Sequence, residues 1–444
     1  MGRRLGINLV LFLVLVLAFA GGVWLRLHFV PAPGRINPQA EIDPARPYRL
    51  VLWDFERPLG GAGPSYRAEL TQVVEAFRER HPNVTVTIEL LPWSEEEGER
   101  RLAAALKEGA PPDVLATGPL PASDWGPLVV ACESYLVAEE KEGYIWPGRV
   151  DAPEGSGRVA WPRWLEPLCW AGNEELLTAA GVPAATLQAQ GWNWEEFARL
   201  AERVQALPGE PALFTSFNLV TLWGELGRDD VPGAAGKPPW TAESVQRAAE
   251  RAARLWESAA IPRRIGQAGY SALEDFFNGR VALCGPVRPW FFRAAHERTE
   301  RVRHGNLDPG EARPFPLVLL PSPGSLPGGM RVVQAEQLYV FRQRRYQGDD
   351  HTRAAMELAR HLTRSSARLA ARLDVVPACR AAQQAWVEEW EVGDGSTLVK
   401  WLEQGAVPAE GGAAAAEREA RLAPLLHRFW EGGLTAAGLA QEYR

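Results

Sequence analysis

The feature that most constrains the fold is an alternation of strand and helix patterns after residue 47. "YRLVLWDF" (Tyr48–Phe55) is typical of a strand, and helical spacing of apolar residues follows between Leu70 and Phe77. Apolar residues then alternate at every second position between Val84 and Leu90. An acidic-start helix pattern (Glu95–Glu108) and the strand pattern "PDVLATG" complete a β-α-β-α-β order. This order predicts a parallel sheet covered by helices.

Candidate binding residues stand where these strands are expected to end. Ligands of open α/β sheets bind at the carboxyl ends of the strands. Those ends carry Trp53, Asp54, Glu56 and Thr117. An ionised carboxylate accepts several hydrogen bonds, which suits a hydroxyl-rich ligand. The alternative for Trp53 is a place in the strand core, and for Asp54 a loop-capping role.

A second α/β unit is expected downstream, because 444 residues exceed one ordinary core. Within it, "FFNGRVALCGPVRPW" predicts a turn at Asn278–Gly279 and a buried strand over Val281–Cys284. We expect Gly285–Pro286 to end that strand, because proline cannot continue a hydrogen-bonded ladder. Trp290 then either packs in the core or faces a ligand. The last third of the chain is mostly helical in pattern, and "EGGAAAAEREA" (Glu410–Ala420) is expected to be a loop that enters a helix.

The composition argues against some classes of binding partner. The net charge of −7 argues against nucleic acid and against an anionic membrane surface as partners of the folded body. The 18 tryptophans suit cores, interfaces and sugar-like ligands alike. The four cysteines lack metal-site spacing, and we expect buried free thiols. No cofactor or metal is predicted.

The amino-terminal segment directs the chain to the membrane. Arg3 and Arg4 precede an uncharged stretch, Leu9–Leu25, which is close to the roughly 20 residues that span a bilayer. A cleavable signal peptide ending near Ala18–Ala20 is the rival interpretation. We favour an uncleaved anchor over residues 1–30 and a tether over 31–47. The body is then extracytoplasmic, and it is secreted if the segment is cleaved.

Several short segments together resemble a known family. They are "LVLWDF", "FRERHPNVTVTIELLPW", "LAAALKEGAPPDVLATG", "LCWAGNEELLTAAGVP", "GWNWEEF", "FFNGRVALCGP", "LLPSPG" and "EGGLTAAGLAQE". In this order they are similar to landmarks of the family 1 extracellular solute-binding proteins of ABC importers, which include maltose- and oligosaccharide-binding proteins. The resemblance covers nearly all of the chain from Tyr48 to Arg444.

The resemblance implies a type II periplasmic-binding-protein fold, in which two α/β lobes joined by a hinge close on a ligand in an interlobe cleft. Residues 48–165 with 320–374 are then expected to form the N-terminal lobe. Residues 166–319 with 375–444 are expected to form the C-terminal lobe. The third crossing between the lobes would lie near Asp374–Pro377.

The resemblance also suggests site residues beyond the first strand ends. Trp290 matches the position of an aromatic that stacks on a sugar ring, and Glu166 that of a hinge carboxylate. Trp161 and Trp164 crowd the first crossing, and Trp223 is a further candidate for which core packing is the alternative. The full predicted set of ligand-binding residues is Trp53, Asp54, Glu56, Thr117, Trp161, Trp164, Glu166, Trp223 and Trp290.

The implied function is capture of a small solute, a sugar or oligosaccharide, by lobe closure and its delivery to the permease subunits of an ABC importer. We expect a monomer without catalytic residues. One alternative is a membrane-anchored sensor partner of the same fold. A lower one is a glycosidase that pairs Asp54 or Glu56 with Glu166. Gly172 and Glu174 replace the family's usual tyrosine and lysine, which leaves the identity of the solute open.

Overall fold

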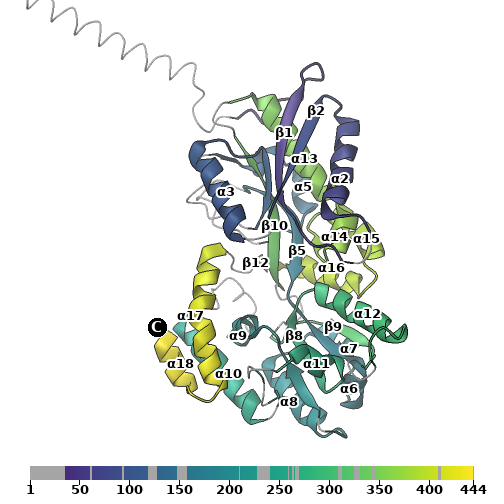
Figure 1. Ribbon diagram of the computed structural model, residues 1–444, viewed down its shortest axis with the longest axis vertical. Coiled ribbons are helices and arrows are strands. Elements are labelled where there is room, and N and C mark those ends of the chain that lie inside the picture. Colours follow the sequence, from purple (N-terminus) through teal and green to yellow (C-terminus); the bar gives the residue numbers. More distant parts are fainter. Residues whose placement is uncertain are drawn as a thin grey trace, which may run out of the picture.

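A computed structural model describes the chain from residue 36 to 443, except for 61–62, 93–94, 119–127, 148–157, 210, 228–240, 259, 263–264, 266–269, 309–312, 325–330, 343–345 and 409–411. The predicted anchor segment 1–30 and residues 31–35 of the predicted tether lie outside this part, and residues 36–47 of the tether lie within it. Two α/β lobes follow one another along the long axis of the molecule, each built on its own sheet (Figure 1). None of the described helices is long and apolar enough to cross a membrane.

The first sheet confirms the parallel arrangement expected from the sequence. β1 pairs in parallel with both β2 and β3, and the antiparallel strand β10 joins β3 to β5. The strand order is β11 (Val376–Pro377), β5 (Trp161–Pro167), β10 (Arg331–Phe341), β3 (Val114–Thr117), β1 (Tyr48–Phe55) and β2 (Val84–Leu91). Two short strands also pair with β10: β4 (Val129–Val130) and β12 (Ala406–Pro408).

Amphipathic helices cover this sheet (Figure 1). In α2 the Ser65 side chain caps the first turn, and Leu70, Val74 and Phe77 keep helical spacing on the buried face. The helices of this lobe are α2 (Tyr66–Arg80), α3 (Glu95–Glu108), the 3₁₀ helix η1 (Cys132–Tyr135), α5 (Ala138–Glu142), α13 (Asp349–Arg364), α14 (Ala367–Arg372), α15 (Arg380–Glu389) and α16 (Gly395–Gln404).

The second lobe is built on a smaller sheet of strand order β7 (Ala212–Thr215), β8 (Val281–Val287), β6 (Cys169–Asn173) and β9 (Leu317–Leu320). Asn193 and Glu196 form a capping box at the start of its helix α8. Its helices are α6 (Glu174–Ala179), α7 (Ala184–Gln190), α8 (Trp194–Gln205), α9 (Leu219–Leu226), α10 (Ala242–Glu257), α11 (Ala272–Phe277), α12 (Trp290–Arg303), α17 (Gly412–Trp430) and α18 (Ala436–Tyr443). The segment expected as a loop over 410–420 is largely helical, because α17 already begins at Gly412.

The chain passes between the lobes at three places. β5 of the first sheet leads directly into β6 of the second, and β9 of the second sheet leads back to β10 of the first. The third place differs from the expected one near Asp374–Pro377. β11 and β12 both pair within the first sheet, so the chain belongs to the first lobe up to Pro408, whereas α17 packs with helices of the second lobe. The lobe limits remain predictions that this pairing refines.

The expectation that Gly285–Pro286 ends a strand was wrong. β8 continues to Val287, and Cys169 of β6 pairs with that residue. The proline is tolerated because β7 last pairs at Cys284 and the β6 pairing shifts register at this point. A glycine is required before it, since a Cβ on Gly285 would lie 2.3 Å from the Trp170 ring.

The four cysteines, Cys132, Cys169, Cys284 and Cys379, are buried and free. This confirms the interpretation of buried thiols. Burial raises the pKa of the Cys284 thiol, which keeps it in the neutral, unreactive form.

Candidate functional site

The carboxyl edges of the two sheets face each other across the lobe boundary. β5 runs parallel to β1 and β3 and passes into the second lobe immediately after Pro167. The carboxyl ends of the parallel strands in the first sheet therefore point toward the second lobe. In the second sheet, Val287 at the end of β8 pairs with Cys169, the first residue of β6. The ends of β7 and β8 consequently point toward the first lobe.

The first edge is filled by buried ion pairs. Asp54 is fully buried, and its Oδ2 accepts hydrogen bonds from Arg163 Nη1 at 2.8 Å and from the Tyr66 hydroxyl at 2.7 Å. Arg163 Nη1 also donates to Glu336 Oε1 at 2.9 Å. Burial and the neighbouring Asp54 raise the pKa of Tyr66. Asp54 is thus enclosed by the protein's own groups, which contradicts its predicted place among ligand-facing residues in this conformation.

Arg57 and Trp164 close the same edge. Arg57 forms an ion pair with Glu336, and its guanidinium carbon lies 5.2 Å from the Trp164 ring centroid. The Arg163 guanidinium packs on the same ring at 3.8 Å. Trp164 is buried, and its indole N–H donates to Ser366 Oγ at 3.4 Å. The packing therefore favours a structural role for Trp164 in place of the predicted ligand contact.

A local irregularity in β5 explains how an arginine comes to lie in this interior. Trp164 pairs with Glu336 and Pro162 pairs with Gln337, so Arg163 is an extra residue in the ladder. A β-bulge bends the strand and re-aims the side chain of the extra residue. Here the bulge directs the guanidinium to the two carboxylates.

The carboxyl edge of the second sheet is not filled by ion pairs and instead exposes aromatic side chains. Phe217 follows the end of β7 and Trp290 follows the end of β8. Each side chain is 39% exposed, and their ring centroids lie 5.8 Å apart at an interplanar angle of 59°. Phe217 also stacks on the buried Phe291, with ring centroids 6.1 Å apart. This contact holds the Phe217 ring in place. The alternative of a core position for Trp290 is excluded by this exposure.

One ion pair joins the two edges. Glu166 near the end of β5 accepts a hydrogen bond from Arg288 Nη1, just beyond β8, at 3.0 Å. The Glu166 side chain is 18% exposed. Burial raises the pKa of this carboxyl, and the attraction of Arg288 offsets that effect only in part. Glu166 thus lies at the lobe boundary, as predicted, although its contact with a ligand stays a prediction.

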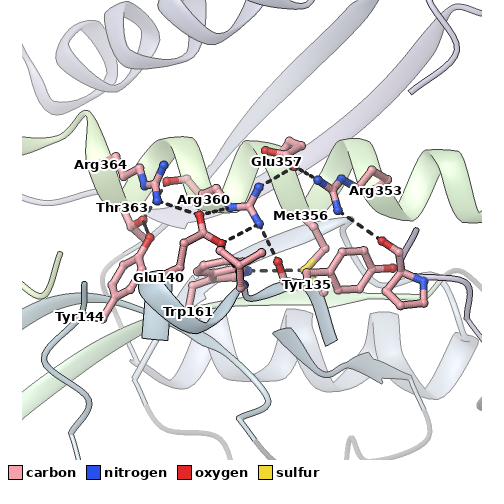
Figure 2. A network of polar contacts seen from close by, with 12 residues as sticks. Tyr135, Glu140, Tyr144, Trp161, Arg353, Met356, Glu357, Arg360, Thr363 and Arg364 are labelled. Atoms are coloured by element: carbon pink, nitrogen blue, oxygen red, sulfur yellow. Dashed lines mark hydrogen bonds and ion pairs between the residues drawn. The ribbon is translucent and has the colours of Figure 1, made fainter. Parts of the chain in front are cut away.

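Trp161 lies far from this boundary. It occupies the amino end of β5, six residues from Pro167, and at ~3.3 Å per residue that is about 20 Å away. Its indole is buried beneath α13 and donates to Met356 Sδ at 3.4 Å, with the Arg360 guanidinium carbon 5.3 Å from the ring centroid (Figure 2). Arg360 is itself held by Glu140 and Glu357. The predicted ligand role for Trp161 is contradicted by this placement.

The remaining predicted residues divide into two groups. Trp53 packs in a small buried cluster under Arg101, and Trp223 packs edge-on against Phe429 and Trp430 in the second lobe. Both side chains are buried, so the core alternatives fit them better. Glu56 is exposed and Thr117 is partly exposed, at the ends of β1 and β3. Their predicted roles are compatible with these positions.

Sequence reasoning missed Arg57, Arg163, Phe217, Arg288 and Glu336. The arginine in the strand pattern "WPRWLEP" and the glutamate in "RVVQAEQLYVF" were signals, because a charge within an apolar strand requires a partner. Phe217 had the same signal as Trp290, an aromatic just after a strand. Among the described residues, no group of three or more His, Cys, Asp or Glu side chains could hold a metal ion.

Comparison with known proteins agrees with this geometry. The chain is similar in fold to the sugar-binding protein MalE from Xanthomonas citri (17% identity, 89% of this chain and 95% of that one, TM-score 0.66). It is also similar to the cyclic α-maltosyl-1,6-maltose binding protein from Arthrobacter globiformis (14%, 89% and 97%, 0.61). A third is an ABC substrate-binding protein from Listeria monocytogenes in complex with cycloalternan (13%, 89% and 97%, 0.57).

A search of curated proteins finds no match to the sequence. The sequence profile described as bacterial extracellular solute-binding protein matches residues 63–283, and that match contains the ends of β3, β5 and β7. The two-lobe fold and the order of landmarks agree with it. The chain belongs to the bacterial extracellular solute-binding proteins.

Proposed function

We propose that this protein captures a sugar or oligosaccharide between its two lobes and delivers it to the permease of an ABC importer. The observation that carries the proposal is the exposed Phe217–Trp290 pair at the carboxyl ends of β7 and β8. The apolar C–H face of a sugar ring packs on aromatic rings, while its hydroxyls require polar partners. Two of the solved structures that share the fold are named for a sugar ligand.

The residues proposed to contact the solute differ from the sequence-based set. From the second lobe they are Phe217 and Trp290, with Arg288 at their side. From the first lobe they are Glu56 and Thr117, with Glu166 at the boundary. Carboxylate and hydroxyl groups at these strand ends would accept and donate hydrogen bonds to sugar hydroxyls.

Closure of the lobes would bring these two groups together and enclose the solute. A protein of this family acts outside the cytoplasm. We propose that it works as a monomer, held at the membrane by the uncharged segment Leu9–Leu25. The family is one of binding proteins, and the enclosure of Asp54 removes one carboxylate from the glycosidase alternative.

A thermal-shift screen of the purified protein tests the proposal. The panel contains mono- and oligosaccharides, polyols, amino acids and polyamines, because a ligand that binds only the folded state raises the unfolding midpoint. We expect a saccharide hit that is lost in Trp290→Ala and in Phe217→Ala. Tyr346→Ala is the matched control, since Tyr346 is 37% exposed and follows the end of β10 that lies away from the boundary.

The hit must persist in the control variant. Silence across all saccharides with a folded protein would reject the sugar assignment. A hit that survives both aromatic substitutions would reject the proposed site but not the solute class.

A further inference from the structure

A cavity of about 170 Å³ lies in the second lobe between α12, the end of α11 and the segment that leads into β9. One face of α12 forms a wall of it. Phe292, Ala295, His296, Thr299 and Arg303 line the cavity, and their spacing of three or four residues places them on one side of the helix. Phe217 and Trp290 do not line it, so it is separate from the aromatic pair at the lobe boundary.

The inner walls of the cavity are aromatic. Phe277, Phe292 and Phe315 line it, and Phe292 is almost fully buried. Phe315 packs edge-on against Phe276 at 5.4 Å, which holds that ring in place. A dry cavity of ~150 Å³ with apolar walls accommodates benzene. The space is therefore the right size for a single six-membered ring.

The rim of the cavity is cationic. Arg298, Arg303 and Arg313 line it, and no carboxylate is among its described lining residues. The Arg298 guanidinium carbon lies 5.1 Å from the Phe277 ring centroid, so charge and aromatic wall adjoin. Arg303 pairs with Glu300 at 2.5 Å, and Arg313 pairs with Glu175 at 3.1 Å, outside the cavity. A guanidinium carries five N–H donors, more than one such pair uses.

We propose that this cavity is a second binding site, for a small ring-bearing carboxylate such as benzoate. The ring would pack between Phe277, Phe292 and Phe315, and the carboxylate would accept hydrogen bonds at the arginine rim. Three arginines favour an anion over a neutral ring, because charge-assisted hydrogen bonds are about twice as strong as neutral ones. The protein as a whole carries a charge of −7, so the cationic rim differs in sign from the net charge of the molecule.

One residue that lines the cavity also packs against the core of the first lobe. Val392, in the segment between α15 and α16, lines the cavity opposite α12. On another face of α12, Arg293 bonds both carboxylate oxygens of Asp374 at 2.9 Å. A ligand in the cavity would consequently contact both the helix that begins with Trp290 and a segment that packs with the first lobe's core.

Titration of the full-length protein with benzoate, followed by thermal shift and calorimetry, tests the proposal. Benzamide is the neutral control with the same ring, and inorganic phosphate is the anion without a ring. We expect benzoate alone to raise the unfolding midpoint in a saturable way. The double variant Arg303→Gln/Arg313→Gln should weaken benzoate binding about tenfold.

Arg301→Gln is the matched control, because Arg301 is an exposed arginine on the same helix that does not line the cavity. It should bind benzoate as the unmodified protein does. Equal binding of benzamide, an equal effect of phosphate, or unchanged benzoate affinity in the double variant would each overturn the proposal. So would the absence of any benzoate effect at millimolar concentration.

Discussion

The two edges that face each other at the lobe boundary occupy the same topological position and are built in opposite ways. The first is filled by Asp54, Arg57, Arg163 and Glu336, which form ion pairs with one another next to the buried Trp164. The second presents the exposed rings of Phe217 and Trp290. The topology places both edges where a ligand could bind. Whether an edge is accessible depends on whether the protein's own side chains already fill it. In this protein the aromatic edge is the one left available.

The largest expected effect is on the filled edge. Arg163→Met leaves Asp54 without its guanidinium partner in the interior, and breaking a buried pair costs about 3–5 kcal/mol of unfolding free energy. Arg78→Met is the control, because the Arg78–Glu75 pair is on the surface and contributes about 1 kcal/mol or less. Urea unfolding measures both. A loss for Arg163→Met as small as that for Arg78→Met would show that the network does not stabilise this edge.

The two edges can also be compared by removing one tryptophan from each and measuring the unfolding free energy. Trp164→Ala removes a buried indole and should cost about 3–5 kcal/mol. Trp290→Ala removes an indole that is 39% exposed and should change the unfolding free energy much less, by about 1 kcal/mol or below. Comparable losses in the two variants would mean that Trp290 is part of the core, and the aromatic edge would lose its distinct role.

Two carboxylates at the end of β1, one buried and one exposed, should differ in their effect on stability. Asp54→Asn weakens charged hydrogen bonds with Arg163 and Tyr66 and should cost about 1.5–3 kcal/mol. Glu56→Gln changes an exposed side chain and should leave the unfolding free energy within about 0.5 kcal/mol. Chemical unfolding of both variants at pH 7 provides the comparison. If Glu56→Gln proved the more destabilising, the assignment of buried and exposed groups at this edge would be reversed.

The sequence predicted the first sheet well because its signals are local. Apolar alternation in β2 and helical spacing in α2 depend on neighbours within a few residues. The ends of the strands were located correctly, but the direction of each side chain was not. Asp54 is buried because Arg163, 109 residues away, is re-aimed by a bulge. Trp161 is buried because α13, almost 200 residues later, covers it. No local pattern carries such information.

The smallest expected effect concerns Glu166, the group that lies between the edges. Burial raises the pKa of its carboxyl above the ordinary value of 4.5. The folded protein therefore retains this proton at a pH at which the unfolded chain has released it. Stability consequently falls as the pH rises from about 4.5 through the raised pKa, and the loss is complete above it. A pKa that differs by one between the folded and unfolded chain corresponds to about 1.4 kcal/mol, and the partial exposure of this side chain reduces the effect.

Glu166→Gln removes this titration, so the variant should gain stability relative to the unmodified protein as the pH rises above 4.5. The variant also loses the ion pair with Arg288, which by itself would destabilise it. That attraction is already included in the net rise of the Glu166 pKa. Urea unfolding at pH 4 to 7 would reveal the dependence as a difference between the two curves. Arg288→Gln is the matched variant: it removes the attraction that opposes burial and should move the window to higher pH. Parallel curves for Glu166→Gln and the unmodified protein would mean that the boundary carboxylate is already solvated, and that the two edges meet through water.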